Sequence, residues 1–219
     1  MKIMQCWDDS VATDEPLIAL LKKYRAKATF NITPGSLDPH QRTSGWKFKD
    51  EFAVYKLALD EIKDLYQGFK VAGHSMTHPH LPQLSPAELK AELCDCKAFI
   101  RDFIGQEKCG FAYPFGDYND AVKQAVRDAG YIYARSCKNV ECELPLNDPM
   151  ALPSHCHFMS PDFWIRYEKV RAIDGIFYFW GHSYEMMDDP ALWGEFESKL
   201  ARIADDNQAQ WIDIVDIFG

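Results

Sequence analysis

The chain has 219 residues, and its 24 Lys and Arg against 33 Asp and Glu give a formal net charge of −9 at pH 7. That balance argues against a nucleic-acid binder, which needs a surplus of basic side chains to meet the phosphates. No apolar run approaches the roughly 20 residues of a membrane span, and the N-terminus is too short and mixed to be a secretory signal. We therefore expect a cytoplasmic protein that binds neither nucleic acid nor membrane, with one or two domains.

The seven cysteines are an odd number, so they cannot all pair in a disulfide framework. No two of them stand in a C-x-x-C pattern, which disfavours a thiolate zinc site. We expect small buried hydrophobic side chains in a reducing compartment.

Short β-rich segments alternate with amphipathic helical ones along the chain. Strands are expected at residues 3–7, 27–32, 69–72, 109–113, 131–135, 176–180 and 211–215. Helices are expected at residues 13–24, 50–66, 85–104, 119–129, from 160 onward, and 190–204. This alternation predicts a mainly parallel sheet with helices outside it, either closed into a barrel or open. Residues 136–160 have no clear period, which indicates a functional loop or an irregular insertion.

Chemically active residues follow several of the expected strands. In parallel α/β folds the functional groups lie beyond the carboxyl ends of the strands. The residues found there are Asp8-Asp9, His74 with His78, Tyr113-Pro114-Phe115-Gly116, Arg135 and His182. Acidic, imidazole and cationic groups gathered at one edge of a sheet predict an active site.

Asp8 and Asp9 are neighbours in extended backbone, so their side chains point to opposite sides and can divide metal binding and proton transfer. A turn or a helix-capping pair is the alternative interpretation. His74 and His78 are four residues apart, which would put both imidazoles on one side of a helical turn and suits a single metal ion. Two His and one Asp leave open positions on a Zn²⁺-like ion, the pattern of a catalytic site.

Hydrolysis of an amide or ester also needs an acid that protonates the leaving group. His182, directly after the apolar strand expected at residues 176–180, is the candidate. A histidine held only by structural hydrogen bonds is the alternative.

Several stretches resemble one known family in the family's own order, over almost the whole chain. They are Cys6-Trp7-Asp8-Asp9-Ser10, Ala28-Thr29-Phe30, Gly73-His74-Ser75-Met76-Thr77-His78-Pro79, Phe111-Ala112-Tyr113-Pro114-Phe115-Gly116 and Gly181-His182. They resemble the polysaccharide deacetylase family, also called the NodB-homology or carbohydrate esterase family 4 domain. The resemblance implies a distorted (β/α)7 barrel, with residues 1–219 as one catalytic domain.

The resemblance also implies roles for individual residues. A divalent metal, usually zinc, would be held by Asp9, His74 and His78. Asp8 would be the general base and His182 the general acid. The backbone N–H of Phe115 would help to stabilise the oxyanion, and we place Tyr113 and Arg135 with it in the substrate site.

The chain departs from the family pattern in three places. Ser10 replaces the Gly that usually follows the two Asp, and Ala112 stands where many members carry an Arg that orients the catalytic Asp. We hypothesise that Arg135, which ends the next strand, supplies that charge. The family's Asp-rich fourth motif has no clear match, so either Glu185 or Asp213 could orient His182 instead.

Two further features have a functional and a structural interpretation. In the sequence His155-Cys156-His157, one imidazole could reach into the site and touch substrate, or both could be structural. Trp46 lies in an expected polar loop and could stack on a sugar ring, although most of the Trp residues fall at core positions.

The function that we predict is metal-dependent hydrolysis of an acyl group, above all N-linked acetate on an amino sugar or its oligomer. The first alternative is a small amide or cyclic imide as substrate, which the missing signal sequence favours. The second is a non-catalytic carbohydrate-binding domain, which the missing motifs favour. The net charge argues against an acidic polymer as substrate unless the cleft is locally basic.

Overall fold

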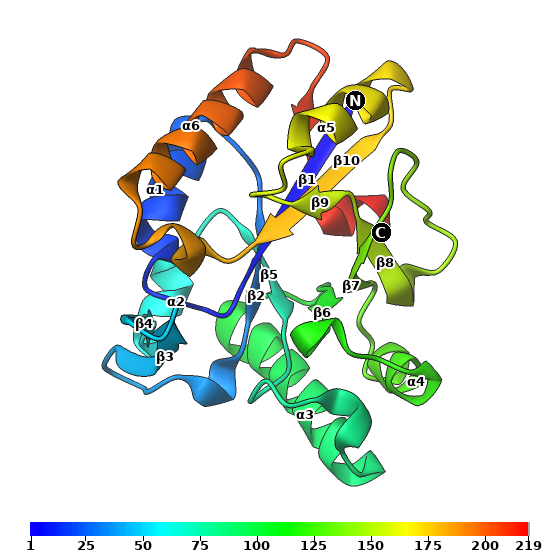
Figure 1. Ribbon diagram of the computed structural model, residues 1–219. Coiled ribbons are helices and arrows are strands. Elements are labelled where there is room, and N and C mark those ends of the chain that lie inside the picture. The colour runs from blue at the N-terminus through cyan, green and yellow to red at the C-terminus, as the bar shows by residue number, and fades with distance from the viewer. Residues whose placement is uncertain (219) are drawn as a thin grey trace.

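Parallel strands alternate with helices along the chain and wrap around a common interior (Figure 1). The computed structural model describes residues 1–218. The strands are β1 (Lys2–Asp8), β2 (Thr29–Ile32), β3 (Thr43–Phe48), β4 (Phe52–Lys56), β5 (Lys70–Gly73), β6 (Phe111–Ala112), β7 (Ala134–Asn139), β8 (Leu152–Ser154), β9 (Cys156–His157), β10 (Ile176–Gly181) and β11 (Gln210–Trp211). The α-helices are α1 (Asp14–Lys23), α2 (Leu59–Leu65), α3 (Pro86–Phe99), α4 (Asp120–Asp128), α5 (Phe163–Ala172) and α6 (Pro190–Asp205).

The main sheet closes on itself through a broken strand. Its order is β8-β7-β6-β5-β2-β1-β10-β9, and every pairing in it is parallel. β8 and β9 are separated only by His155, yet β8 pairs with β7 and β9 pairs with β10. They therefore act as one interrupted strand that joins the two ends of the sheet. The ring has seven strand positions, and the expected (β/α)7 barrel is confirmed.

The strand predictions differ from the structure mainly in two places. Counted along the chain, the sixth of the seven ring positions is taken by β8 and β9. Both lie inside residues 136–160, where the sequence has no clear hydrophobic periodicity. They are too short for alternation to be visible in the sequence. The strand expected at residues 211–215 is wrong for most of its length, because β11 ends at Trp211 and Ile214–Ile217 form a 3₁₀ helix. β11 pairs with the start of β1 and is not a ring position.

The helix expected at residues 50–66 is wrong in its first half. β3 and β4 form an antiparallel hairpin there, and only Leu59–Leu65 are helical. The turn between the strands uses Lys49 and Asp50 in left-handed backbone, with φ of 53° and 58°, where no glycine signals a hairpin. In the sequence, Phe52, Tyr55, Leu59 and Ile62 recur at helical spacing, but the first two lie on β4 and only the last two lie on α2.

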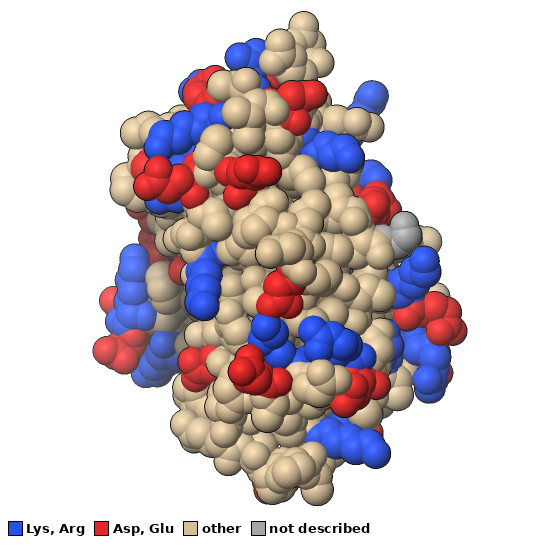
Figure 2. All heavy atoms as spheres, turned by 90° about the vertical axis from the view of Figure 1, so that its right-hand side faces the viewer, with Lys and Arg blue, Asp and Glu red and all other residues tan. Residues whose placement is uncertain are grey.

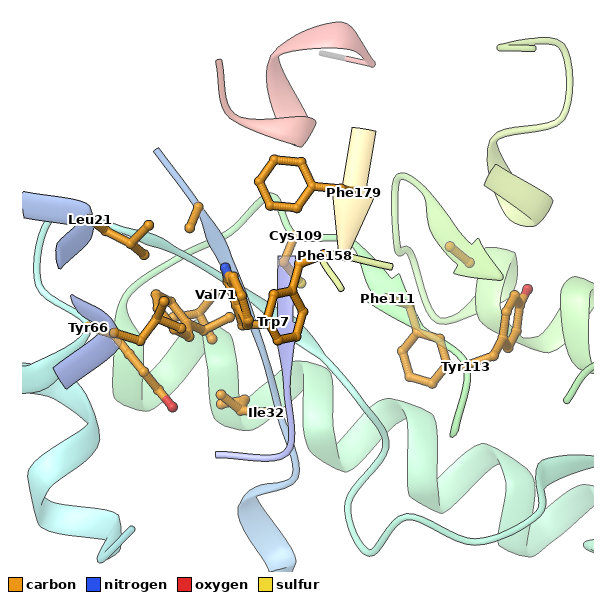
Figure 3. Packing of buried hydrophobic residues seen from close by; sticks show 14 of the residues in the cluster. Trp7, Leu21, Ile32, Tyr66, Val71, Cys109, Phe111, Tyr113, Phe158 and Phe179 are labelled. Atoms are coloured by element: carbon orange, nitrogen blue, oxygen red, sulfur yellow. The ribbon is translucent and has the colours of Figure 1, made fainter. Parts of the chain in front are cut away.

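Buried aromatic side chains fix the carboxyl end of β1. The Trp7 ring lies 5.1 Å from the rings of both Phe158 and Phe196, and its Nε1–H donates to Gln5 Oε1 at 3.0 Å. Figure 3 shows Trp7 and Phe158 packed together in the interior. Because Trp7 is completely buried, the residues that follow it start from a rigid position.

The surface carries charges of both signs. On the face in Figure 2, basic and acidic side chains alternate, and no large area has a single sign. All seven cysteines are free thiols. Four of them are buried, as expected, but Cys94 and Cys142 are only partly buried and Cys137 is exposed. Among residues 1–218, no helix combines the length and the apolar character that a membrane crossing requires.

We predict that Gly181→Ala destabilises the protein by about 2 kcal/mol or more, because overpacking a filled core costs on the order of 1–3 kcal/mol. An added Cβ would lie 2.2 Å from Phe158 Cδ1 and 3.1 Å from the Trp7 ring. The matched control is Gly194→Ala in α6, where a Cβ meets nothing within 4 Å and helix propensity should add about 0.5–1 kcal/mol. Urea unfolding of both variants measures the difference. Equal stabilities would contradict the packing argument.

Candidate active site

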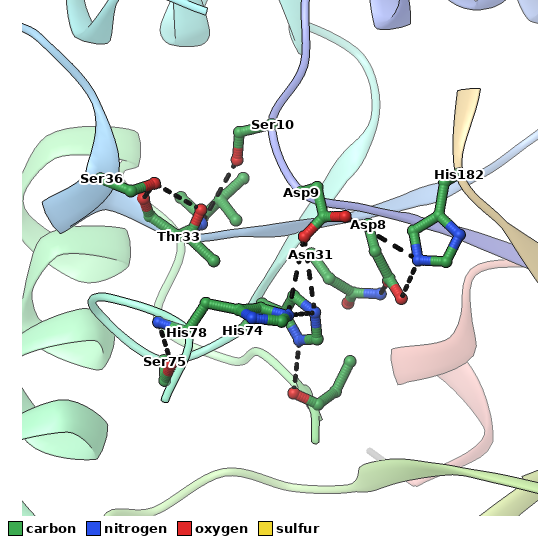
Figure 4. A network of polar contacts seen from close by, with 12 residues as sticks. Asp8, Asp9, Ser10, Asn31, Thr33, Ser36, His74, Ser75, His78 and His182 are labelled. Atoms are coloured by element: carbon green, nitrogen blue, oxygen red, sulfur yellow. Dashed lines mark hydrogen bonds and ion pairs between the residues drawn. The ribbon is translucent and has the colours of Figure 1, made fainter. Parts of the chain in front are cut away.

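Polar groups meet in a cleft at the carboxyl ends of the ring strands. Asp8 is the last residue of β1, His74 follows β5 directly, and His182 follows β10 directly. The cleft has a volume of about 730 Å³ and is lined by these residues together with Asp9 and His78. Figure 4 shows both carboxylates and all three imidazoles turned toward one another.

Asp9, His74 and His78 form a group that fits a metal ion. His74 Nε2 lies 3.1 Å from His78 Nε2, and Asp9 Oδ1 lies 3.9 Å and 3.7 Å from those two nitrogens. Donor atoms on a tetrahedral zinc ion stand about 3.3 Å apart, given bonds of roughly 2.0–2.1 Å. His74 donates its Nδ1–H to the carbonyl of Ala112 at 2.7 Å, which leaves the Nε2 lone pair facing the group.

The electrostatics keep these two imidazoles uncharged. Burial lowers the pKa of His74, and burial together with the neighbouring His74 lowers the pKa of His78 to about 4. Neutral imidazole is the form that binds metals. The donor set of two nitrogens and one carboxylate oxygen suits Zn²⁺ and similar ions.

The loops that carry Asp9, His74 and His78 contain residues with left-handed backbone. The helical turn expected for His74 and His78 is therefore absent. Ser75 and His78 have φ of 62° and 63°, and Ser75 Oγ accepts the N–H of His78 at 2.9 Å. Asp9 and Ser10 also have positive φ, 87° and 54°, a region that favours glycine. Ser10 tolerates it with its Oγ accepting the N–H of Thr33 at 3.3 Å, so the turn forms without the Gly usual in the family.

Asp8 is held by two neighbours inside the barrel. Asn31 Nδ2 donates to its Oδ1 at 2.6 Å, and Arg135 donates to its Oδ2 at 2.5 Å. Burial opposes ionisation of Asp8, but Arg135 and the nearby histidines outweigh it and lower the pKa of Asp8 to about 2. Arg135 stands directly opposite Ala112 in the β6–β7 register, and its guanidinium lies 4.6 Å from the centre of the Trp180 ring. Arg135 thus reaches Asp8 from β7, the strand that pairs with β6 at Ala112.

His182 faces both carboxylates. Its Nε2 lies 3.9 Å from Asp8 Oδ2 and 3.8 Å from Asp9 Oδ2, and its Nδ1 lies 3.2 Å from Glu185 Oε2. Burial works against protonation, yet Glu185 and the two aspartates raise the pKa of His182. The other candidate partner, Asp213, pairs with Lys27 at 3.0 Å instead.

Of the remaining candidate residues, Tyr113 and Phe115 line the cleft, and His157 contacts Glu185 beside it. Tyr113 lines the cleft, but its ring is buried against Tyr118 and its OH donates to the carbonyl of Met150 at 2.8 Å. Phe115 has a φ of 57° and an exposed ring that stacks on His80 with 4.0 Å between ring centres. His157 lies 2.8 Å from Glu185 Oε2.

His155, in contrast, is buried outside the cleft. Its Nε2–H donates to the carbonyl of Cys142 at 2.9 Å and its Nδ1 accepts the N–H of Tyr178 at 3.0 Å. Burial lowers its pKa. The structural interpretation therefore applies to His155, and only His157 reaches a site residue.

Lys56 and Tyr184 also line the cleft, and the sequence does not identify them as site residues. Lys56 on β4 donates to the carbonyl of Asp9 at 2.6 Å and to Thr33 Oγ1 at 3.3 Å, in a region expected to be helical. Tyr184 packs edge-on against Trp46 at 5.1 Å between ring centres. Neither lies in a motif, and only the hairpin, which the sequence does not reveal, brings Trp46 and Lys56 to the cleft.

Several solved structures have folds similar to that of this chain. The Streptococcus pyogenes deacetylase PplD in complex with acetate is 27% identical, with a TM-score of 0.56 over 68% of this chain and 62% of its own. BC0361, a polysaccharide deacetylase from Bacillus cereus, is 19% identical, with a TM-score of 0.55 over 68% of this chain and 45% of its own. This chain thus spans less than two thirds of the length of either. A family 4 acetyl xylan esterase from Clostridium thermocellum, in complex with a cobalt ion, is 15% identical, with a TM-score of 0.63 over 100% of this chain and 90% of its own.

The sequence comparisons place the chain in a family. No curated protein matches it significantly. The family model described as polysaccharide deacetylase matches residues 1–134, which is more than half of the 219 residues and reaches from β1 to the start of β7. With this match, and with the same fold in the solved deacetylases, the chain belongs to the polysaccharide deacetylase family.

Proposed function

We propose that the protein is a metal-dependent deacetylase that hydrolyses the N-acetyl group of an amino sugar, free or in a short oligomer. The observation that carries the proposal is the meeting of an ionised Asp8, the Asp9–His74–His78 group and His182 in one cleft. Family membership supports the acyl-hydrolase chemistry.

Asp9, His74 and His78 would hold the metal. When bound, a divalent cation such as Zn²⁺ would polarise the acyl carbonyl and lower the pKa of water in the site. The donor atoms, with 3.1 to 3.9 Å between them, already have the spacing that such an ion requires.

Asp8 would accept a proton from the attacking water. Its pairing with Arg135 keeps it ionised at neutral pH, and its bond to Asn31 fixes the plane of the carboxylate. A general base held in a fixed position is a more effective catalyst than a mobile one, because the proton that it accepts must be within hydrogen-bond reach. The oxyanion that forms would be stabilised by the backbone N–H of Phe115.

His182 would protonate the departing amine. Its raised pKa favours the protonated form that an acid needs, and Glu185 orients the ring through Nδ1 so that Nε2 faces the carboxylates. This step matters most for an amide, because an amine leaves poorly without a proton.

The cleft walls suit a sugar ring. Trp46, Tyr184 and the exposed Phe115 all line the cleft. Aromatic faces bind the apolar faces of sugars while polar groups contact the hydroxyls. The volume of about 730 Å³ lies in the range of sites for small ligands, so we favour a monosaccharide or short oligomer over a long polymer.

We predict that Asp8→Asn retains the metal and loses turnover by about 10²–10⁴-fold, the usual contribution of a general base. In contrast, Asp9→Ala, His74→Ala and His78→Ala should lose metal and turnover together. Metal analysis by mass spectrometry, beside an acetate-release assay, separates the two classes. An Asp8→Asn protein that works at the wild-type rate would exclude the mechanism.

We predict that Arg135→Ala lowers both turnover and stability, because it leaves the Asp8 carboxylate buried without its cation. Breaking a buried pair costs on the order of 3–5 kcal/mol. Arg135→Lys restores the charge and should recover part of both quantities. Unchanged turnover in the Ala variant would show that Arg135 does not replace the missing family Arg.

The substrate class is tested by a direct screen. Chitooligosaccharides of increasing length and small cyclic amides are assayed with the same metal-loaded protein. We expect acetate release from the shortest chitooligosaccharides and no hydrolytic opening of the cyclic amides. Ring opening without acetate release would favour the small-amide alternative, and no hydrolysis of any substrate by the metal-loaded protein would favour a binding domain.

A further inference from the structure

The β3–β4 hairpin contacts the segment that carries Asp9. Two backbone hydrogen bonds join them, from Ala12 N–H to the carbonyl of Tyr55 at 2.8 Å and from Leu57 N–H to the carbonyl of Ser10 at 3.0 Å. Val11 and Lys56 also form an antiparallel bridge. The hairpin is therefore attached to the residues directly after β1 and is not a free surface loop.

Lys56 extends this attachment to the ligand itself. Its Nζ donates at 2.6 Å to the carbonyl of the peptide that joins Asp9 and Ser10, the two consecutive residues with left-handed backbone. Lys56 is buried, with 7% of the residue exposed, and the ammonium lies 4.9 Å from the centre of the Trp46 ring. A charged donor buried this deeply is costly unless its partners are well placed.

The strained turn needs such a partner. Left-handed backbone in a residue with a Cβ costs on the order of 1–3 kcal/mol and persists only where surrounding contacts fix it. The orientation of this turn decides where the Asp9 carboxylate points, 3.7 to 3.9 Å from the two imidazoles. No other side chain among residues 1–218 donates a hydrogen bond to the Asp9 carbonyl.

We propose that Lys56 is a positioning residue for the metal ligand Asp9, so that the β3–β4 hairpin sets the affinity of the site for a divalent cation. The inference rests on the proposed metal site and goes beyond it, since it assigns part of the metal affinity to a hairpin outside the barrel. Groups that orient metal ligands typically contribute about 10- to 100-fold to affinity.

The test is metal affinity without substrate. Zn²⁺ is titrated into the metal-free full chain in competition with a chromophoric chelator. Lys56→Met should bind Zn²⁺ about 10- to 100-fold more weakly than wild type, and turnover should recover when the Zn²⁺ concentration is raised. The matched control is Lys47→Met on β3, an exposed lysine of the same hairpin, which should keep the wild-type affinity. Wild-type affinity in Lys56→Met would overturn the proposal.

A second measurement needs no variant. Because coupling is reciprocal, Zn²⁺ should slow hydrogen exchange at the amides of Ala12 and Leu57 in the wild-type chain, and leave the α6 amides around Gly194 unchanged. If Zn²⁺ binds without slowing exchange at Ala12 and Leu57, the proposal fails even where Lys56→Met does not fold. If the wild-type chain binds no Zn²⁺ at all, the proposed function fails first.

Discussion

The buried ion pair between Asp8 and Arg135 is the interaction on which the site depends. β1 and β7 are not neighbours in the sheet, so this contact connects two strands across the barrel interior. Removing two charges from water costs several kcal/mol each, and apolar residues in their place are often as stable or more so. The pair is therefore better explained by its chemistry than by stability. It supplies a carboxylate that stays ionised in the cleft although Asp8 is almost completely buried.

The polar side chains converge only because the backbone around them is strained. Among residues 1–218, nine non-glycine residues have positive φ, and five of them line the cleft or directly adjoin a residue that does: Asp9, Ser10, Ser75, His78 and Phe115. Strained backbone persists where surrounding contacts over-determine it, and it concentrates at functional sites. Here those contacts come from short polar side chains and from Lys56, so the loops are held by hydrogen bonds as well as by the core beneath Trp7.

Much of this architecture was predictable from the sequence, because strand–helix alternation and the position of polar residues after strands are local signals. Asp8, His74 and His182 could be placed at one edge of the sheet for that reason. The β3–β4 hairpin and the β8–β9 strand could not be predicted. The first has no glycine in its turn, and the second owes its conformation to β7 and β10 rather than to its own residues. Lys56 escaped detection because its role depends on that hairpin.

The closure of the barrel by late strands has a consequence for the order in which the chain folds. Besides β2 and β6, β1 pairs with β10 and β11 and β7 pairs with β8, and these partners all lie in the last third of the sequence. Until that part is present, both strands would expose unpaired backbone donors and acceptors, the kind of edge that promotes association between chains. The residues that complete the sheet also position His182. The same late segment thus removes the exposed strand edges and brings His182 into the cleft, so closure of the barrel also completes the candidate site.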